Sequence, residues 1–261
     1  MRASSRAERA EQDAIARAAK QEQARVAHGV AASQRALEAR LDDAERAVAE
    51  VSRLLPAPKP EKLRVLLLGA SADGSLRVGR EQKRIRAAVE SSLHRDQIEL
   101  DVRPAATTED LLDGISKFRP HVIHFSGHSD SDLIKFEEEL DEPHDEVIVS
   151  AAAFARAVRA TDQPPLLVLL NSCRSAGHID HLVEHVTPFA IGMADEIDDS
   201  DAIAYAARFY ANIANGQSIE SAHLAARAAL ELAGLDGANL PTLAWAEDVD
   251  PATTLLVVPT D

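Results

Sequence analysis

From Leu63 onward, short apolar runs alternate with stretches of amphipathic helical spacing. This alternation is typical of a mostly parallel sheet with helices packed on its faces. Six strands are expected, at residues 63–68, 98–102, 121–125, 166–170, 189–192 and near Leu243 or Leu255. Helices are expected near residues 81–93, 109–118, 151–158, 179–186, 201–214 and 219–233. The sequence therefore predicts an α/β fold in three layers, α/β/α, around a mostly parallel six-stranded sheet.

Two local signals refine this layout. Residues 133–136 and 147–149 are short apolar runs on either side of the acidic stretch 137–145, which predicts a surface hairpin. Gly216 and Gly234 follow two expected helices, where a left-handed C-cap favours glycine.

The first 55 residues differ from the rest. They contain no proline and one glycine, and alanine, arginine, glutamine and glutamate dominate, which predicts a helical segment over residues 1–55. Its apolar residues from Leu37 to Leu55 are spaced alternately by four and three, the pattern of a coiled-coil seam. Three prolines in 56–60 then stop any helix, so residues 56–62 are expected to be a linker and 63–261 the main domain. A short, exposed seam favours self-association or a partner helix.

Composition excludes several classes of protein. The formal net charge of -15 argues against nucleic-acid binding, which relies on clustered Lys and Arg. No apolar run approaches the length of a membrane span and no signal segment is visible, so a cytoplasmic protein with no membrane partner is expected. One cysteine permits neither an internal disulfide nor a cysteine-rich zinc site. The 22 arginines against six lysines suggest a GC-rich bacterial genome.

Two expected strands end in polar residues that could perform chemistry. One runs into Ser126, Gly127, His128 and Ser129, and another runs into residues 171–176, which include Cys173. Because the carboxyl ends of parallel strands meet at one edge of a sheet, these segments should lie close together. A histidine beside the only cysteine can take its proton and leave a nucleophilic thiolate.

Backbone amides of the same segments could complete an acyl-transfer site. Gly127 would let the chain turn sharply, and the amides near Ser129 and Cys173 could donate to an oxyanion. The plainer interpretation is that Cys173 is a small buried hydrophobe and His128 an ordinary turn residue, which holds for most single cysteines.

Resemblance to a known family favours the first interpretation. Residues 124–129, His-Phe-Ser-Gly-His-Ser, resemble the catalytic-histidine motif of caspase-like cysteine peptidases, and residues 170–176, Leu-Asn-Ser-Cys-Arg-Ser-Ala, resemble their catalytic-cysteine motif. The best resemblance is to the bacterial CHAT branch, over most of residues 63–246, with further similarity at 65–70, 76–81, 191–193 and 225–227. Ser129 departs from the family, which usually has glycine there, and its side chain would narrow the cleft.

The resemblance implies roles for individual residues. His128 would be the general base and Cys173 the nucleophile of peptide-bond hydrolysis, with neither metal nor cofactor. Asn171 stands two residues before the cysteine, where the family lines the pocket for the substrate side chain preceding the cleaved bond, and relatives that cut after Lys or Arg carry Asp there. Its neutral amide predicts a preference for neutral or small residues, unless Asp199 or the acidic hairpin compensates.

Other candidate sites are weaker. His178, His181 and His185 share one face of an expected helix and could bind a metal, although solvated surface is the better interpretation. Residues 69–75 follow a strand but match no nucleotide-binding motif, and the acidic stretch 137–145 matches no EF-hand. Of His121 and His124, one should face inward as a hydrogen-bonded core residue.

Two functional hypotheses follow. The first is a regulated bacterial cysteine endopeptidase with a protein substrate, acting in defence or programmed cell death as the resemblance implies, with its N-terminal helix binding a partner or a second copy. The alternative is a catalytically silent caspase-like adaptor module recruited through that helix. The presence of both His128 and Cys173 favours the enzyme.

Overall fold

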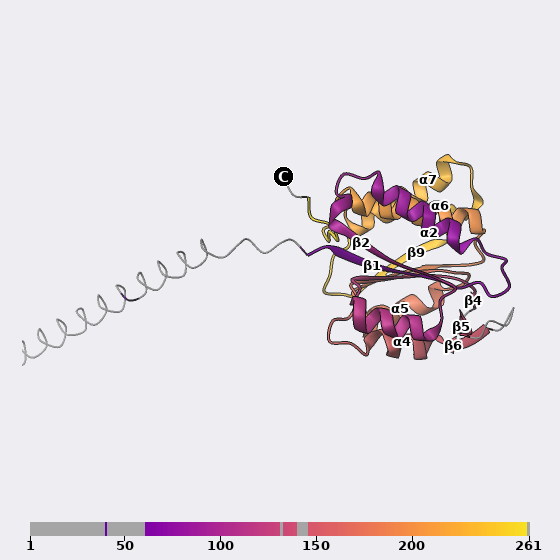
Figure 1. Cartoon of the computed structure of the whole chain (residues 1–261). Helices are drawn as coiled ribbons and strands as arrows, with labels where there is room; N and C mark the ends of the chain where they lie inside the picture. Colours follow the sequence, from indigo (N-terminus) through magenta and orange to yellow (C-terminus); the bar gives the residue numbers. More distant parts are fainter. Residues whose placement is uncertain (1–39, 41–60, 131–132, 140–145, 260–261) are drawn as a thin grey trace, which may run out of the picture. The chain divides into compact units, whose positions relative to one another are not determined.

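The computed structural model of the chain describes residues 61–130, 133–139 and 146–259, together with Arg40. The chain divides into two units, Met1–Lys59 and Pro60–Asp261, and the second carries the fold (Figure 1). The predicted helical segment 1–55, apart from Arg40, and residues 56–60 of the predicted linker lie outside the described residues, as do 140–145 of the acidic stretch.

A six-stranded sheet forms the middle of this unit. Its strands, in sheet order, are β2 (Ile98–Pro104), β1 (Leu63–Gly69), β3 (Val122–Ser126), β7 (Leu167–Asn171), β8 (Phe189–Met193) and β9 (Pro241–Trp245). The first five are parallel, and β9 pairs antiparallel with β8. The predicted mostly parallel sheet of six strands is confirmed. Its last strand is the one near Leu243, whereas Leu255 makes only an isolated bridge with Ser218.

Helices cover both faces of the sheet (Figure 1). One face packs against α2 (Val78–Glu90), α6 (Asp199–Ala214) and α7 (Ile219–Leu232). The other packs against α3 (Thr108–Asp113), the π-helical turn Gly114–Phe118, α4 (Ala151–Arg159) and α5 (Ala176–His185). Short 3-10 turns occupy Arg95–Gln97 and Asp236–Asn239.

Strand β1 shows how the sequence separates the two cores. Val65 and Leu67 are buried in the core under α2, α6 and α7, whereas Leu66 and Leu68 are buried in the core on the opposite face. Alternate side chains of a strand point to opposite faces, so a strand buried on both faces must be apolar throughout. The predicted α/β/α sandwich is therefore confirmed.

A small antiparallel sheet follows β3. Strands β5 (Leu133–Glu137) and β6 (Glu146–Ser150) form the predicted hairpin, and β4 (Ser129–Asp130) adds a third strand beside β5. This sheet fixes the backbone directly after His128.

The glycines predicted as helix caps adopt that conformation. Gly216 has φ of 78° after α6 and Gly234 has φ of 66° after α7. Of the helices in the described ranges, none combines the length and the apolar character that a bilayer crossing requires.

Candidate functional site

The carboxyl ends of β3 and β7 bring the two candidate catalytic segments together. Ser126 on β3 is the register partner of Asn171 on β7, so His128 and Cys173 each lie two residues beyond a paired position. The segments also touch directly, because the Ser129 hydroxyl donates a hydrogen bond of 2.5 Å to the backbone carbonyl of Cys173. The predicted meeting of these segments at one sheet edge thus has a structural basis in strand register.

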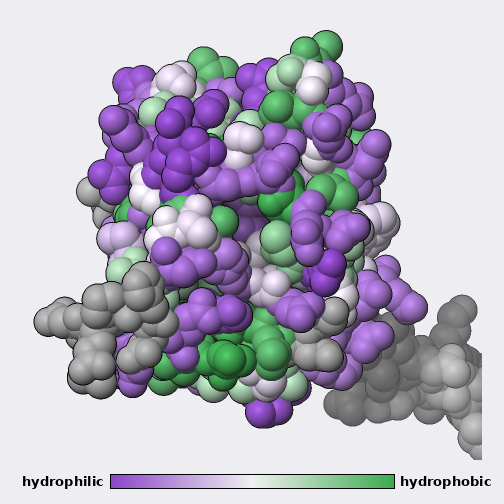
Figure 2. Space-filling model, turned by 90° about the vertical axis from the view of Figure 1, so that its right-hand side faces the viewer, coloured by the Kyte–Doolittle hydropathy of each residue, from purple (hydrophilic) through white to green (hydrophobic). Residues whose placement is uncertain are grey.

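Figure 2 shows the face of the molecule on which these strand ends lie. Hydrophilic side chains predominate over its upper part. His128 is partly exposed, with 30% of its side chain accessible, and Cys173 is half-buried with a free thiol. Neither residue is therefore fully enclosed in the core.

The imidazole of His128 is held by the loop after β1. Its Nε2 lies 3.2 Å from Asp73 Oδ1 and 2.9 Å from Ser75 Oγ. A carboxylate only accepts hydrogen bonds, so this contact places the ring proton on Nε2 and leaves Nδ1 as the basic nitrogen. Nδ1 makes no hydrogen bond to any residue that the structure describes. The ring is thus oriented with one nitrogen free to take a proton.

Asp73 is itself fixed in its charged form. The backbone N–H of Ser75 donates to Asp73 Oδ1 at 3.0 Å, and the hydroxyls of Ser75 and Ser71 donate to the same oxygen at 2.9 and 3.1 Å. The two hydrogen bonds from Ser75 hold the pKa of Asp73 well below its usual value, and His128 adds to the effect. Asp73 is therefore a carboxylate at neutral pH.

The turn at Cys173 is strained and anchored. Arg174, the next residue, has φ of 54°, in the left-handed region that non-glycine residues rarely adopt. Its backbone N–H donates to Asp195 O at 3.2 Å, and its guanidinium lies 2.9 Å from Glu196 Oε1 and 3.4 Å from Asp195 Oδ1. These contacts hold a conformation that would otherwise relax.

Two backbone N–H groups remain available beside this turn. That of Cys173 has no hydrogen-bond partner within the described part of the chain. The amide of Lys135 donates to His128 O at 3.1 Å, which makes Ser129 and Ile134 a non-hydrogen-bonded pair of the β4–β5 ladder. The N–H of Ser129 is therefore not used by that ladder, and both amides can serve an oxyanion.

Gly127 is required for a different reason from the one expected. Its φ is not in the left-handed region, so the sharp turn predicted for it is not what demands glycine. Instead, a Cβ on Gly127 would lie 2.8 Å from Ala70 O and 2.7 Å from the Phe125 ring. Close approach to the backbone at the end of β1 therefore excludes a side chain here.

Asn171 lies at the base of this site. It is 5% exposed, and its amide group donates to Glu81 Oε1 at 2.6 Å and to Ala202 O at 3.0 Å. Its Oδ1 is buried without a partner among the residues described. Asp199 pairs with Arg77, with 2.6 Å between Arg77 Nε and Asp199 Oδ2. The charge of Asp199 is thus offset by Arg77.

Glu81 joins the ends of the two strands from below. Its buried carboxylate accepts hydrogen bonds from Asn171 and from the Ser126 hydroxyl, and it lies 3.0 Å from His124 Nε2. His124, 1% exposed, also contacts the Tyr210 hydroxyl at 3.2 Å. The expectation that one of His121 and His124 is a hydrogen-bonded core histidine is confirmed for His124.

The three histidines considered as a metal site separate into two groups. His178 is buried, and its Nε2 contacts Asp130 O at 3.0 Å. His181 and His185 are exposed and lie with Glu184, their donor atoms all within 4.8 Å of one another. Any metal would thus be held by these three residues, without His178.

Sequence reasoning missed Asp73, Ser75 and Glu81. The loop 69–75 matches no nucleotide-binding motif, but β1 is adjacent to β3 in the sheet, so its loop must lie near His128. An acidic residue in that loop was the available signal for Asp73. Glu81 offered a weaker signal, as a charged residue in the first turn of a helix whose burial only the structure reveals.

Comparison with known proteins agrees with this fold. A "Probable protease" of Gillisia limnaea (strain DSM 15749 / LMG 21470 / R-8282) is 26% identical over 157 residues, which are 58% of this chain. The matched region spans 27% of that relative's length. The family model for the CHAT domain matches residues 46–247, a range that holds β1 to β9 and both candidate catalytic segments. The chain belongs to the CHAT domain family.

Proposed function

We propose that this protein is a cysteine endopeptidase in which Cys173 is the nucleophile and His128 the general base. The observation that carries the proposal is the hydrogen bond from Ser129 to the Cys173 carbonyl, which joins the two motif segments beyond a register-paired position. Membership of the CHAT domain family and similarity to a relative named a probable protease support the same activity.

The acylation step uses the groups in this arrangement. His128 Nδ1 takes the proton of the Cys173 thiol while Asp73 and Ser75 hold Nε2. The thiolate attacks the peptide carbonyl carbon, and the N–H groups of Cys173 and Ser129 stabilise the resulting oxyanion. Collapse of this intermediate breaks the C–N bond, and His128 returns its proton to the leaving amine. A thioester on Cys173 remains.

Hydrolysis of the thioester completes the cycle. His128 takes a proton from water as the water oxygen attacks the thioester carbonyl. The C–S bond then breaks, the new carboxylic acid leaves, and the proton on His128 restores the thiol. Every group is regenerated, and neither metal nor cofactor is required.

We propose a preference for neutral or small residues before the cleaved bond. Asn171 supplies no charge, and Arg77 offsets that of Asp199 at 2.6 Å. A basic substrate side chain would have to compete with the Arg77 guanidinium for the Asp199 carboxylate. A peptide-library profile tests this, since a strict requirement for Arg or Lys would contradict it.

The test of the activity itself is a matched set of substitutions. Cys173→Ala and His128→Ala should each abolish peptide cleavage and leave thermal unfolding nearly unchanged, because both side chains are partly exposed. His94→Ala, which removes an imidazole outside the site, should retain full activity. A wild type that neither cleaves any peptide nor reacts with a thiol-directed peptide electrophile, alone or with its partners, would contradict the proposal and favour the adaptor module.

We further propose that the protease acts in the bacterial cytoplasm in defence or cell death, regulated through residues 1–55. The seam from Leu37 to Leu55 would bind a partner helix or a second copy. Leu41→Asp with Val48→Asp should weaken association, measured by light scattering, and leave cleavage by the domain intact. Equal masses for wild type and variant, with and without partners, would contradict this role.

A further inference from the structure

Three side chains that can bind metals gather on the last turns of α5. His181, Glu184 and His185 are exposed and occupy positions i, i+3 and i+4, which share one face of a helix. The imidazole centroids lie 4.7 Å apart in an edge-on arrangement. The donor atoms of all three residues lie within 4.8 Å of one another, a spacing that small side-chain rotations can close around one ion.

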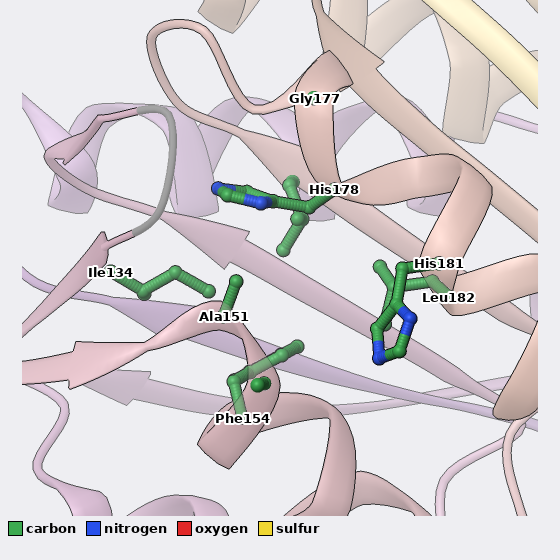
Figure 3. A pocket seen from close by; sticks show the side chains of 9 residues that line it. Ile134, Ala151, Phe154, Gly177, His178, His181 and Leu182 are labelled. Atoms are coloured by element: carbon green, nitrogen blue, oxygen red, sulfur yellow. The ribbon is translucent and has the colours of Figure 1, made fainter.

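These groups are not engaged elsewhere in the described part of the protein. Over the ranges that the structure describes, neither imidazole nor the Glu184 carboxylate forms a hydrogen bond or ion pair with another residue. His178, on the same helix, differs: its Nε2 contacts Asp130 O at 3.0 Å and it is buried. Figure 3 shows His178 turned toward the strand of Ile134, while His181 stands at the other end of a cavity of about 250 Å³. The metal-binding atoms of His181, Glu184 and His185 therefore form a group separate from His178.

The helix end adds a favourable electrostatic term. His185 is the last residue of α5, where carbonyl groups left without intrahelical partners create a negative potential. The Val186 N–H satisfies only the carbonyl of Leu182 there. A cation held by His181 and His185 would therefore lie in a potential that favours it.

We propose that His181, Glu184 and His185 form a binding site for a divalent transition-metal ion. Two imidazole nitrogens and one carboxylate oxygen are a donor set that suits zinc, which completes its tetrahedral coordination with water. The spacing His-x-x-Glu-His also occurs on helices of zinc peptidases, where the two histidines bind the ion. Here no further His, Cys, Asp or Glu from the described residues joins the group, so the site binds a metal on the surface and does not build a hydrolytic centre.

The binding test uses the full chain carrying Cys173→Ala, so that the thiol beside His128 cannot compete for the ion. After removal of metal with a chelator, titration with Zn²⁺ against a chromogenic competitor should reveal one site. His181→Ala and His185→Ala should each weaken binding at least about tenfold, and the double variant should abolish it. Glu184→Gln should weaken binding less, because both imidazoles remain.

Two controls separate this site from other histidines and from misfolding. His94→Ala, an imidazole elsewhere on the domain, should bind Zn²⁺ as the parent does. All variants should unfold at the parent temperature without metal, because their side chains are exposed, whereas Zn²⁺ should raise the unfolding temperature of the parent and not of the double variant. Equal binding by the parent and the double variant, or no binding by the parent, would overturn the proposal. Neither result depends on peptidase activity.

Discussion

The side-chain amide of Asn171 donates a hydrogen bond of 2.6 Å to the carboxylate of Glu81, 90 positions away in the sequence. The Ser126 hydroxyl donates to the same carboxylate, and Ser126 is the register partner of Asn171. One buried carboxylate therefore connects β3 and β7 two residues before His128 and Cys173. Burial disfavours the charged form of Glu81 and by itself would raise its pKa. The interactions with His124, Ser126 and Asn171 outweigh this effect of burial and hold the pKa of the carboxyl below its usual value.

A charge swap tests this connection. Asn171→Asp alone should destabilise the fold, by about 3 kcal/mol in urea unfolding, because it places a second carboxylate against Glu81. Adding Glu81→Gln reverses donor and acceptor, so the double variant should recover at least half of that loss. If the loss of stability in the double variant equals the sum of the losses in Asn171→Asp and in Glu81→Gln, the two side chains do not interact.

The same double variant tests specificity. With a carboxylate at position 171 and a neutral amide at position 81, selection before the cleaved bond should shift toward Lys and Arg. The shift should be roughly ten- to a hundredfold in kcat/KM, the value of one charge-assisted contact in a dry pocket. The peptide library that profiles the wild type measures this shift. An unchanged profile in a folded, active double variant would remove Asn171 from the substrate pocket.

Asp73 should orient His128 for catalysis. Asp73→Asn keeps the size of the side chain but lets its amide donate toward Nε2, which disfavours the ring form with a free Nδ1. We expect kcat to fall roughly ten- to a hundredfold with little change in KM. The fall in kcat should be smaller than for a fully buried carboxylate partner, because the Asp73 side chain is half exposed. Asp96→Asn, which neutralises an exposed carboxylate outside the site, is the matched control and should be neutral. If Asp73→Asn were as active as Asp96→Asn, Asp73 would have no role in orienting His128.

Ser129 should stabilise the site even though the family usually has glycine there. Its hydroxyl contacts the Cys173 carbonyl at 2.5 Å and Ser172 Oγ at 2.7 Å, so it bridges the two loops. Ser129→Ala should cost about 1 kcal/mol in unfolding free energy and lower kcat. Ser172→Ala removes only the second contact and should have the smaller effect on both measurements. If Ser172→Ala had the larger effect on stability and kcat, the contact of Ser129 with the Cys173 carbonyl would contribute nothing.

The sheet could be predicted because strands buried on both faces leave an unmistakable pattern. Helix boundaries differ from those expected: the helix expected at 81–93 is Val78–Glu90. The helix expected at 109–118 ends at Asp113 and continues as a π-helical turn, where a Cβ at Gly114 would collide with the buried side chain of Leu66, which would have to shift. Strand β4 has two residues and cannot show a periodicity.

The sequence could predict only those site residues that directly follow the ends of strands. His128 and Cys173 follow apolar runs and therefore meet at one edge. Asp73 and Glu81, in contrast, lie 55 and 90 positions from the side chains that they contact, His128 and Asn171. The local sequence shows that both residues are acidic but does not identify the side chains they contact, because the pairing depends on the order of the strands and on which face of α2 is buried.

Burial of His223 should make the fold less stable in acid. This side chain is 5% exposed on α7, and its Nδ1 contacts the Tyr205 hydroxyl at 2.7 Å. Burial, aided by the nearby positive charge of Arg227, lowers the pKa of His223 from 6.5 to about 4. Between these values the unfolded chain binds a proton that the folded chain does not. The stability that the fold gains from keeping His223 neutral is therefore fully present above pH 6.5 and is lost as the pH falls toward 4.

The size of this loss can be measured directly. At about 1.36 kcal/mol for each pKa unit, the gap between 6.5 and about 4 removes roughly 3 kcal/mol of unfolding free energy. Urea unfolding at pH 7, 5.5 and 4.5 should show this decline in the wild type. His223→Gln cannot titrate and keeps an amide group for the Tyr205 hydroxyl, so its stability should fall less steeply over the same range. Parallel pH dependences for the two proteins would contradict the assignment, since carboxylates elsewhere contribute equally to both.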